Sequence, residues 1–288
     1  MRPSIVQCIS KVSAVVIVVF SLVDIVQAGP ARPLYLSTGS QIQVLQFNSI
    51  IDSWTTGEQE FSIAVDMTVR TWSQGNQFLS PLGKEYLLDG TPTGATYANG
   101  VGCCFRDGTT DGQFNYAIRQ VASAANSIYR FNLDWTDPQV MPVNPIYGSL
   151  LLGGITGITY DSSDDTFWLA GGNDFLFVEH ITRAGNLISS FGGGTGSMAS
   201  LAYDAADDTL WLYSARPGLS TLSHYAASDD MTHANFPITS EPGIGFVTGI
   251  EFQLQHLAPV PEPATVVLLA AGLAIVLSVS ARKRNRRS

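Results

Sequence analysis

Two stretches of the chain repeat with an offset of 43 residues, and this repeat restricts the fold more than any other feature. They read ITGITYDSSDDTFWLAGG at 155–172 and MASLAYDAADDTLWLYSA at 198–215. Each has an alternating strand that ends in Tyr-Asp, a polar turn that ends in Asp-Asp-Thr, and a second strand that contains Trp, which is the pattern of a β-hairpin. The opening strand recurs as VTGIEFQ at 247–253. Repeats of this length, made of short strands, indicate an all-β fold built from similar units.

The spacing of the repeats favours a β-propeller. Looser copies of the hairpin occur at 61–72 and 114–133, so strand starts recur roughly every 43 to 50 residues, which suits blades of about four strands. The last copy, at 247–253, is not followed by further strands that could pair with it before Pro259. Residues 33–48 resemble the later strands of a blade. We therefore expect N-terminal strands to complete the last blade, which gives five blades. A sixth blade is the alternative because 73–113 is irregular, and a β-sandwich with two similar hairpins is another.

The N-terminus has the pattern of a secretory signal peptide. Arg2 supplies positive charge, residues 12–23 are apolar, and Val-Gln-Ala puts a small residue at the cleavage position. We predict cleavage between Ala28 and Gly29, which gives an exported domain over 29–257.

The C-terminal segment, 258–288, has the pattern of a single membrane anchor. Its 18 residues from Ala264 to Ala281 carry no charge and are just long enough to cross a bilayer as a helix. The prolines before them prevent an earlier helix start. Basic residues after the span predict a tail that stays inside while the acidic domain lies outside; these are Arg282, Lys283, Arg284, Arg286 and Arg287.

The order of features in this segment resembles the PEP-CTERM sorting signal of bacterial exported proteins. The motif is formed by Val260, Pro261, Glu262 and Pro263, and the span and the basic tail follow it. The resemblance implies that an exosortase, a membrane transpeptidase-like enzyme, reads the motif and cleaves there. An ordinary anchor with a chance Pro-Glu-Pro is the alternative.

The charge of the chain is divided between its body and its tail. The formal net charge is −9, but residues 29–259 hold 8 Lys or Arg against 22 Asp or Glu, a balance of −14. A surface of this sign repels phosphate backbones, so we expect no nucleic-acid partner. Of the three cysteines, Cys8 belongs to the signal peptide, and the adjacent Cys103 and Cys104 cannot join distant segments. A vicinal disulfide and a pair of free thiols both remain open.

Repeated acidic residues are the candidates for a ligand site in the body. Carboxylate oxygens spaced along a loop suit Ca²⁺, and Asp107 and Asp111 occur in a further Gly-Thr-rich turn. The other interpretation is that Asp accepts backbone N–H bonds in turns, and we favour it because the Gly and distal Glu of an EF-hand loop are missing. The weak calcium candidates are Asp161, Asp164, Asp165, Asp204, Asp207 and Asp208.

Catalytic patterns are not convincing. The four histidines lack metal-ligand spacing, and there is no Gly-x-Ser-x-Gly motif. Four tryptophans recur at similar places in the repeats, which suggests packing between blades, with a carbohydrate platform as the alternative; they are Trp72, Trp135, Trp168 and Trp211.

The sequence therefore predicts an exported, non-enzymatic protein of the cell surface or extracellular matrix, without a cofactor and sorted through its C-terminal segment. One alternative is a propeller that binds polysaccharide or a partner protein. A propeller hydrolase or lyase is a third, and it would need carboxylates or histidines that converge near the central channel.

Overall fold

A computed structural model describes most of the body of the chain. It covers residues 30–47, 49–73, 82–98, 102, 104–120, 127–142, 154–171, 176–194, 199–216, 219–227, 232–237 and 247–255. The predicted signal peptide with its cleavage site, Cys103 and the whole sorting motif, span and basic tail lie outside the described residues. Within the described part, no helix is long and apolar enough to cross a membrane. The chain divides into two units, Met1–Leu254 and Gln255–Ser288.

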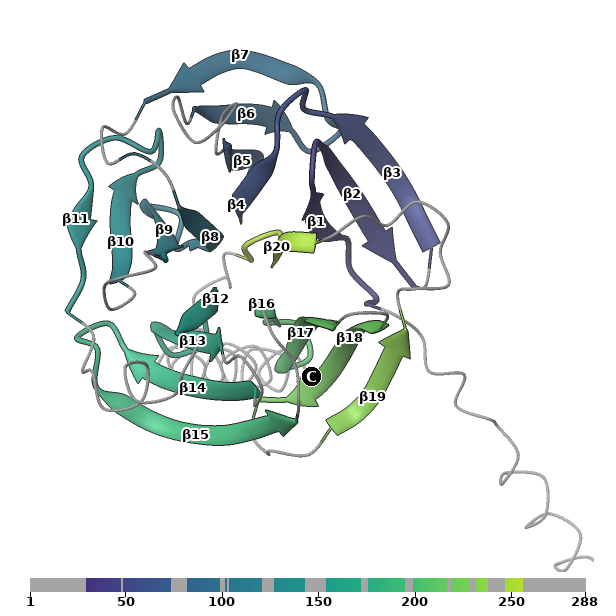
Figure 1. The fold of residues 1–288 in the computed structure, drawn as a ribbon, viewed down its shortest axis with the longest axis vertical. Coiled ribbons are helices and arrows are strands. Elements are labelled where there is room, and N and C mark those ends of the chain that lie inside the picture. Colours follow the sequence, from purple (N-terminus) through teal and green to yellow (C-terminus); the bar gives the residue numbers. More distant parts are fainter. Residues whose placement is uncertain are drawn as a thin grey trace, which may run out of the picture. The chain divides into compact units, whose positions relative to one another are not determined.

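Twenty strands form five four-stranded antiparallel sheets, arranged around a common centre (Figure 1). Blade 1 contains β4 (Glu60–Val65), β5 (Thr68–Ser73), β6 (Gly83–Leu87) and β7 (Pro92–Tyr97). Blade 2 contains β8 (Phe105–Thr110), β9 (Phe114–Arg119), β10 (Ser127–Asn132) and β11 (Gln139–Val140). Blade 3 contains β12 (Ile155–Asp161), β13 (Thr166–Gly171), β14 (Leu176–Thr182) and β15 (Leu187–Gly194).

The other two blades complete the ring. Blade 4 contains β16 (Ala199–Asp204), β17 (Thr209–Arg216), β18 (Leu219–Ala226) and β19 (Thr232–Pro237). Blade 5 has the order β20-β1-β2-β3, made of β20 (Val247–Phe252), β1 (Leu34–Thr38), β2 (Gln41–Gln46) and β3 (Ser49–Thr55). The unit is a five-bladed β-propeller, and the predicted fold class and blade number are confirmed.

Blade 5 closes the ring by joining the two ends of the folded body. The C-terminal strand β20 pairs antiparallel with the N-terminal β1, in a register that sets Leu34 opposite Phe252 and Leu36 opposite Ile250. This pairing confirms the predicted composite blade. It also provides hydrogen-bond partners for the backbone N–H and C=O groups of β20, the innermost strand, which would otherwise be unpaired.

The hydrophobic core consists of five clusters, and each lies between two neighbouring blades. In β13, for example, Trp168 and Ala170 pack towards blade 4, whereas Phe167 and Leu169 pack towards blade 2. Successive side chains of a strand point to opposite faces of its sheet, so a blade with two buried faces needs a nearly continuous apolar strand. This requirement explains the Phe-Trp-Leu and Leu-Trp-Leu runs of the sequence.

The repeat in blade 2 begins one strand earlier than the sequence pattern indicated. Residues 114–133 include β9 and β10, the second and third strands, and the innermost strand is β8. Trp135 consequently does not occupy the place of the other repeat tryptophans. It follows β10 with a φ of 57° and packs against Trp72 with ring centroids 6.1 Å apart.

Candidate functional site

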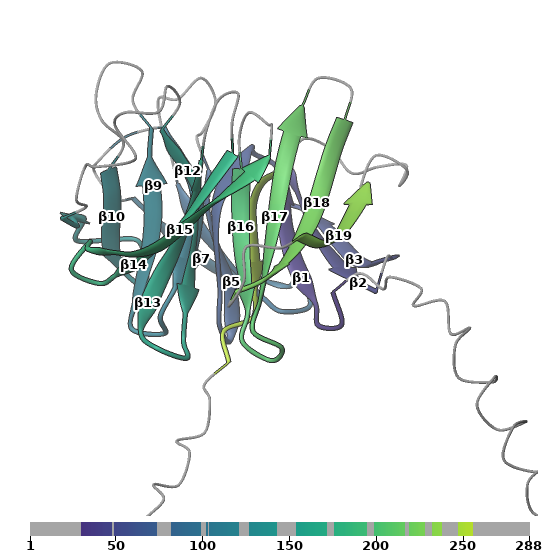
Figure 2. The same cartoon turned by 90° about the horizontal axis from the view of Figure 1, so that it is seen from below.

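The repeated Asp-rich turns lie at one end of the ring. The turns β12–β13 and β16–β17 lie at the end from which β20 leaves the sheet (Figure 2). The last Asp of each turn adopts a left-handed conformation, with φ of 63° at Asp165 and 57° at Asp208. Asp tolerates this conformation better than most residues, which is why both turns end in Asp-Asp-Thr.

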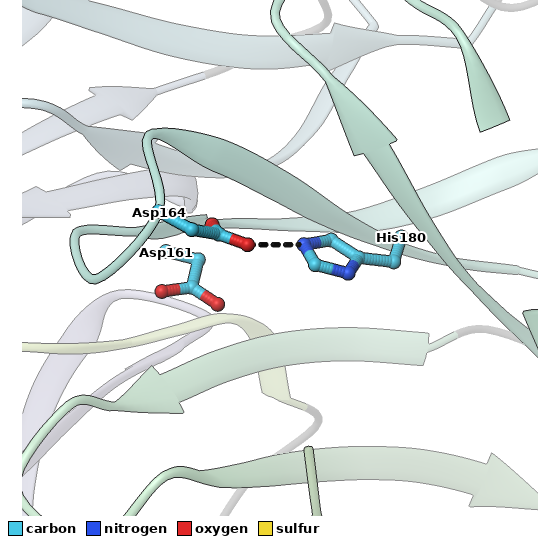
Figure 3. Close-up of side chains that lie close together, drawn as sticks. All are labelled: Asp161, Asp164 and His180. Atoms are coloured by element: carbon cyan, nitrogen blue, oxygen red, sulfur yellow. Dashed lines mark ion pairs between the residues drawn. The ribbon is translucent and has the colours of Figure 1, made fainter. Parts of the chain in front are cut away.

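The turn of blade 3 brings three possible metal ligands together (Figure 3). One ligand atom each of Asp161, Asp164 and His180 lies within 4.8 Å of the others. The two aspartates come from the end of β12 and from the turn, and His180 comes from β14. The Nε2 atom of His180 lies 3.6 Å from Oδ2 of Asp164. Two carboxylates and an imidazole are a donor set that divalent transition metals accept.

These donor atoms also have partners within the blade. Asp161 accepts hydrogen bonds from the backbone N–H of Ser163 at 2.9 Å and from Nε1 of Trp168 at 3.1 Å. The Thr166 hydroxyl lies 2.5 Å from Nε2 of His180 and donates to Asp164. Burial lowers the pKa of His180, which favours a neutral imidazole near pH 7. These bonds hold the turn against β13 and β14.

Blade 4 repeats part of the arrangement. Trp211 stacks on His224 with centroids 4.5 Å apart, as Trp168 stacks on His180 at 3.9 Å, and both pairs face each other across neighbouring strands. In blade 4, however, Nη1 of Arg32 lies 2.7 Å from Oδ1 of Asp204. The recurrence of the Trp–His stack in two blades favours a structural role for this pair. The sequence carries a signal for these histidines, since each follows a repeated Trp, but both lie beyond the matching stretches 155–172 and 198–215.

The six calcium candidates are not gathered into one site. Among the described groups, Asp161 and Asp164 join His180, whereas Asp165 turns towards Nε of Arg183 at 2.5 Å. Asp208 accepts the Tyr203 hydroxyl at 3.0 Å. The Thr209 hydroxyl donates to Asp207 at 2.5 Å. Backbone N–H bonds of the kind expected in turns are donated by Ser163 to Asp161 at 2.9 Å and by Ala206 to Asp204 at 3.0 Å.

Arg183 forms an ionic clamp between blades 2 and 3. Its Nη2 lies 2.8 Å from Asp111, and its Nη1 donates to the Tyr116 hydroxyl at 2.9 Å. The Tyr116 hydroxyl donates to Asp111 at 2.7 Å. Burial opposes ionisation of Asp111, but its hydrogen bonds with Tyr116, Phe114, Gln113 and Arg183 hold its pKa below the usual value.

Asp107 is a fully buried acid at the centre of the ring, where the sequence pattern had predicted a turn. Asp107 lies instead within β8 and reaches three other innermost strands. It accepts backbone N–H bonds from Ile158 of β12 at 3.3 Å, Leu201 of β16 at 2.7 Å and Ile250 of β20 at 3.1 Å. One side chain thus joins blade 2 to blades 3, 4 and 5. We call it the central clasp.

Glu251 is a second fully buried acid close to the central clasp. It accepts the Thr159 hydroxyl at 3.2 Å, and the charge of Asp107 opposes its ionisation. Burial raises the pKa of both acids well above the usual values, while backbone N–H donors oppose that rise at Asp107. Asp107 accepts more backbone N–H bonds than Glu251. We therefore expect that a charge on this pair lies on Asp107 and the proton on Glu251, because charged acceptors gain most from N–H donors.

The repeat tryptophans are buried in the core. Trp72, Trp135, Trp168 and Trp211 are each at most 3% exposed, so they pack between blades and form no exposed carbohydrate platform.

Comparisons with known proteins identify the C-terminal segment. Residues 259–285 match the model of the PEP-CTERM protein-sorting motif. A search of curated protein sequences finds no match. Among solved structures, similarity extends to a chain of a nidogen/laminin complex, with a TM-score of 0.49 over 77% of this chain and 98% of that one.

Two further structures are similar. A protein of unknown function from Bacteroides caccae has a TM-score of 0.42 over 81% of this chain and 80% of its own. The Cps50 β-propeller domain of Myceliophteria thermophila has a TM-score of 0.43 over 72% of this chain and 68% of its own. All three share 12% identity with this chain. The chain is thus an exported five-bladed propeller with a PEP-CTERM sorting motif.

Proposed function

We propose that the protein is a non-enzymatic propeller of the cell surface or extracellular matrix, delivered there by an exosortase that reads Pro261-Glu262-Pro263. One observation carries the proposal: the sorting motif matches residues 259–285, which follow the propeller in the sequence. The backbone N–H of Leu254, near the end of the described residues, donates to the Val65 carbonyl at 2.8 Å. Cleavage at the motif would release a closed propeller. In this scheme the basic tail lies inside and the propeller outside.

The way the polar groups of the propeller are used supports a non-enzymatic role. Asp161, Asp164 and His180 hold a turn that blade 4 repeats, and Asp107 binds backbone groups of three strands. A catalytic acid or base must instead be within reach of a substrate. The groups that most resemble a site are therefore engaged in holding the fold.

The sorting step can be tested in the native host. Mass spectrometry of the surface protein should show an N-terminus at Gly29 and no peptides from Ala264 onward. A Glu262→Ala variant should retain its C-terminal peptides and stay in the membrane fraction, while a Gln255→Ala variant outside the motif should be processed normally. Recovery of intact chains that end at Ser288 in the mature surface pool would contradict processing.

Binding of a partner protein is the second candidate function. The large apolar side chains exposed in the described part are mostly aliphatic, and four lie on the outermost strands: Ile51, Val140, Leu187 and Ile188. Aliphatic surface suits protein contacts, whereas sugar rings stack on exposed aromatics. A pull-down from envelope extracts with the mature protein, beside a polysaccharide-binding screen, decides between the two ligands. Retention of polysaccharide without a protein partner would reverse this preference.

A further inference from the structure

Glu60 lies at the seam where the composite blade 5 meets blade 1. It begins β4, and its backbone is bonded to both halves of blade 5. Its N–H donates to the carbonyl of Gly39, in the turn after β1, at 2.8 Å. Its carbonyl accepts the hydroxyl of Thr248, in β20, at 2.7 Å. Glu60 therefore touches the N-terminal and the C-terminal parts of the ring closure.

The side chain of Glu60 is buried beside a single cation. Its carboxylate is fully buried, and Nζ of Lys84 lies 3.7 Å from Oε1. Lys84 also donates to the Thr56 carbonyl at 2.8 Å and lies 3.9 Å from Glu58. Among the described residues, neither carboxylate oxygen of Glu60 makes a well-formed hydrogen bond, although the hydroxyls of Thr71 and Thr56 lie near enough to favour its ionised form. A buried carboxylate with one distant cation is poorly stabilised in its charged form.

The surrounding groups determine how this carboxylate titrates. Burial raises the pKa of Glu60 to about 7, although Lys84 and the hydroxyls of Thr71 and Thr56 oppose the rise, and Glu58 adds to it. Tyr86 is a further ionisable group near Glu60. Burial, together with the charges of Glu60 and Glu58, raises the pKa of Tyr86. Blade 5 contributes the hydroxyl of Thr248 to this region and no charged group that acts on Glu60.

We propose that Glu60 is a pH-responsive latch in the ring closure, which holds blade 5 to blade 1 when it is protonated and loosens this seam when it is ionised. The direction of the pH effect on stability follows from the difference in the pKa of Glu60 between the folded and unfolded states. The pKa of Glu60 is higher in the folded state than its ordinary 4.5, so the folded state binds the proton more tightly. Its stabilising effect is present below about pH 4.5 and is lost as the pH rises towards and through 7. Between pH 6 and 8 Glu60 alone should raise the unfolding equilibrium constant roughly tenfold.

A matched pair of variants separates the latch from ordinary buried acids. Burial also raises the pKa of Glu179 to about 7, but Glu179 lies in β14 of blade 3, away from the seam. Glu60→Gln and Glu179→Gln should each reduce the pH dependence of urea unfolding by a similar factor. The two variants should differ in where the molecule opens.

Hydrogen exchange of the full-length protein at pH 6 to 8, corrected for intrinsic rates, locates the opening. In the wild type, protection of β20, β1 and β4 should fall about tenfold relative to blade 4. Glu60→Gln should abolish this difference, and Glu179→Gln should preserve it. Equal loss of protection in all blades, or an unchanged difference in Glu60→Gln, would overturn the latch.

A direct titration keeps the test valid if Glu60→Gln does not fold. The carboxyl carbon of Glu60, followed by NMR in the wild type, should titrate near pH 7. In Lys84→Met its pKa should rise further, because the cation that favours ionisation is gone. A titration midpoint near 4.5 in the wild type would refute the proposal.

Discussion

The central clasp gives the sharpest prediction, because Asp107 accepts three backbone N–H bonds while it is fully buried. Asp107→Asn preserves the size of the side chain but replaces one acceptor oxygen by an NH₂ donor. The least costly placement turns that NH₂ towards Ile250 and leaves one N–H facing a donor. An unsatisfied buried donor costs about 1–3 kcal/mol, so we expect a loss of about 2–3 kcal/mol.

Asp107→Ala should be more harmful. It removes all three acceptor contacts, and three orphaned N–H groups correspond to roughly 3–9 kcal/mol before any gain from removing a buried charge. Typical domains have only about 5–15 kcal/mol of stability, so we expect this variant to fail to form a closed ring at ambient temperature.

Glu251→Gln is the control for both variants. If Glu251 carries the proton in the folded state, an amide reproduces one donor and one acceptor, and the change should cost less than about 1 kcal/mol. Urea unfolding followed by tryptophan fluorescence measures all three variants. If Asp107→Asn stays within about 0.5 kcal/mol of the wild type, or Glu251→Gln is the more damaging, the assignment of charge to Asp107 is wrong.

Two further predictions concern contacts between blades. A chain that ends before Val247 lacks β20 and should expose β1 and remain open, whereas a chain that ends at Ala258 should fold, as circular dichroism and size-exclusion chromatography would show. Arg183→Met should cost about 1–2 kcal/mol at pH 7, because it unpairs the buried Asp111 while Arg183 itself is 38% exposed and partly screened. The pKa of Asp111 lies below its usual value of 3.8 in the folded state, so its contribution is present above about pH 3.8 and is lost at lower pH. The denaturation midpoints of wild type and variant should therefore converge in acid, and a constant difference at all pH values would contradict the clamp.

Much of the fold could be predicted from the sequence because propeller blades bury both faces of each sheet. Apolar runs around Trp168 and Trp211, separated by Asp-rich turns, favour repeated sheets that are buried on both faces. The composite blade followed from the same logic, since the strand at 247–253 had no partner after it.

The centre of the ring could not be predicted, and the reason is physical. Asp107 lies in Phe-Arg-Asp-Gly-Thr-Thr, a sequence with one apolar residue that resembles a turn. Innermost strands pack their backbones closely around the axis: a Cβ on Gly249 would lie 2.4 Å from the Phe61 carbonyl. The innermost strands therefore need small and polar residues at positions where a typical buried strand has apolar ones. Glu60 was missed for a related reason, because its burial depends on strands from both ends of the chain.

Blade 5 is held to its two neighbours by different chemistry. On the blade 4 side, Arg32 pairs with Asp204 and donates to the Gln253 carbonyl at 2.6 Å. A guanidinium stays charged across the accessible pH range, so this contact does not change between pH 6 and 8. On the blade 1 side, the buried Glu60 changes charge in that interval. A rise in pH should consequently open the ring at one seam only, with blade 5 remaining attached to blade 4.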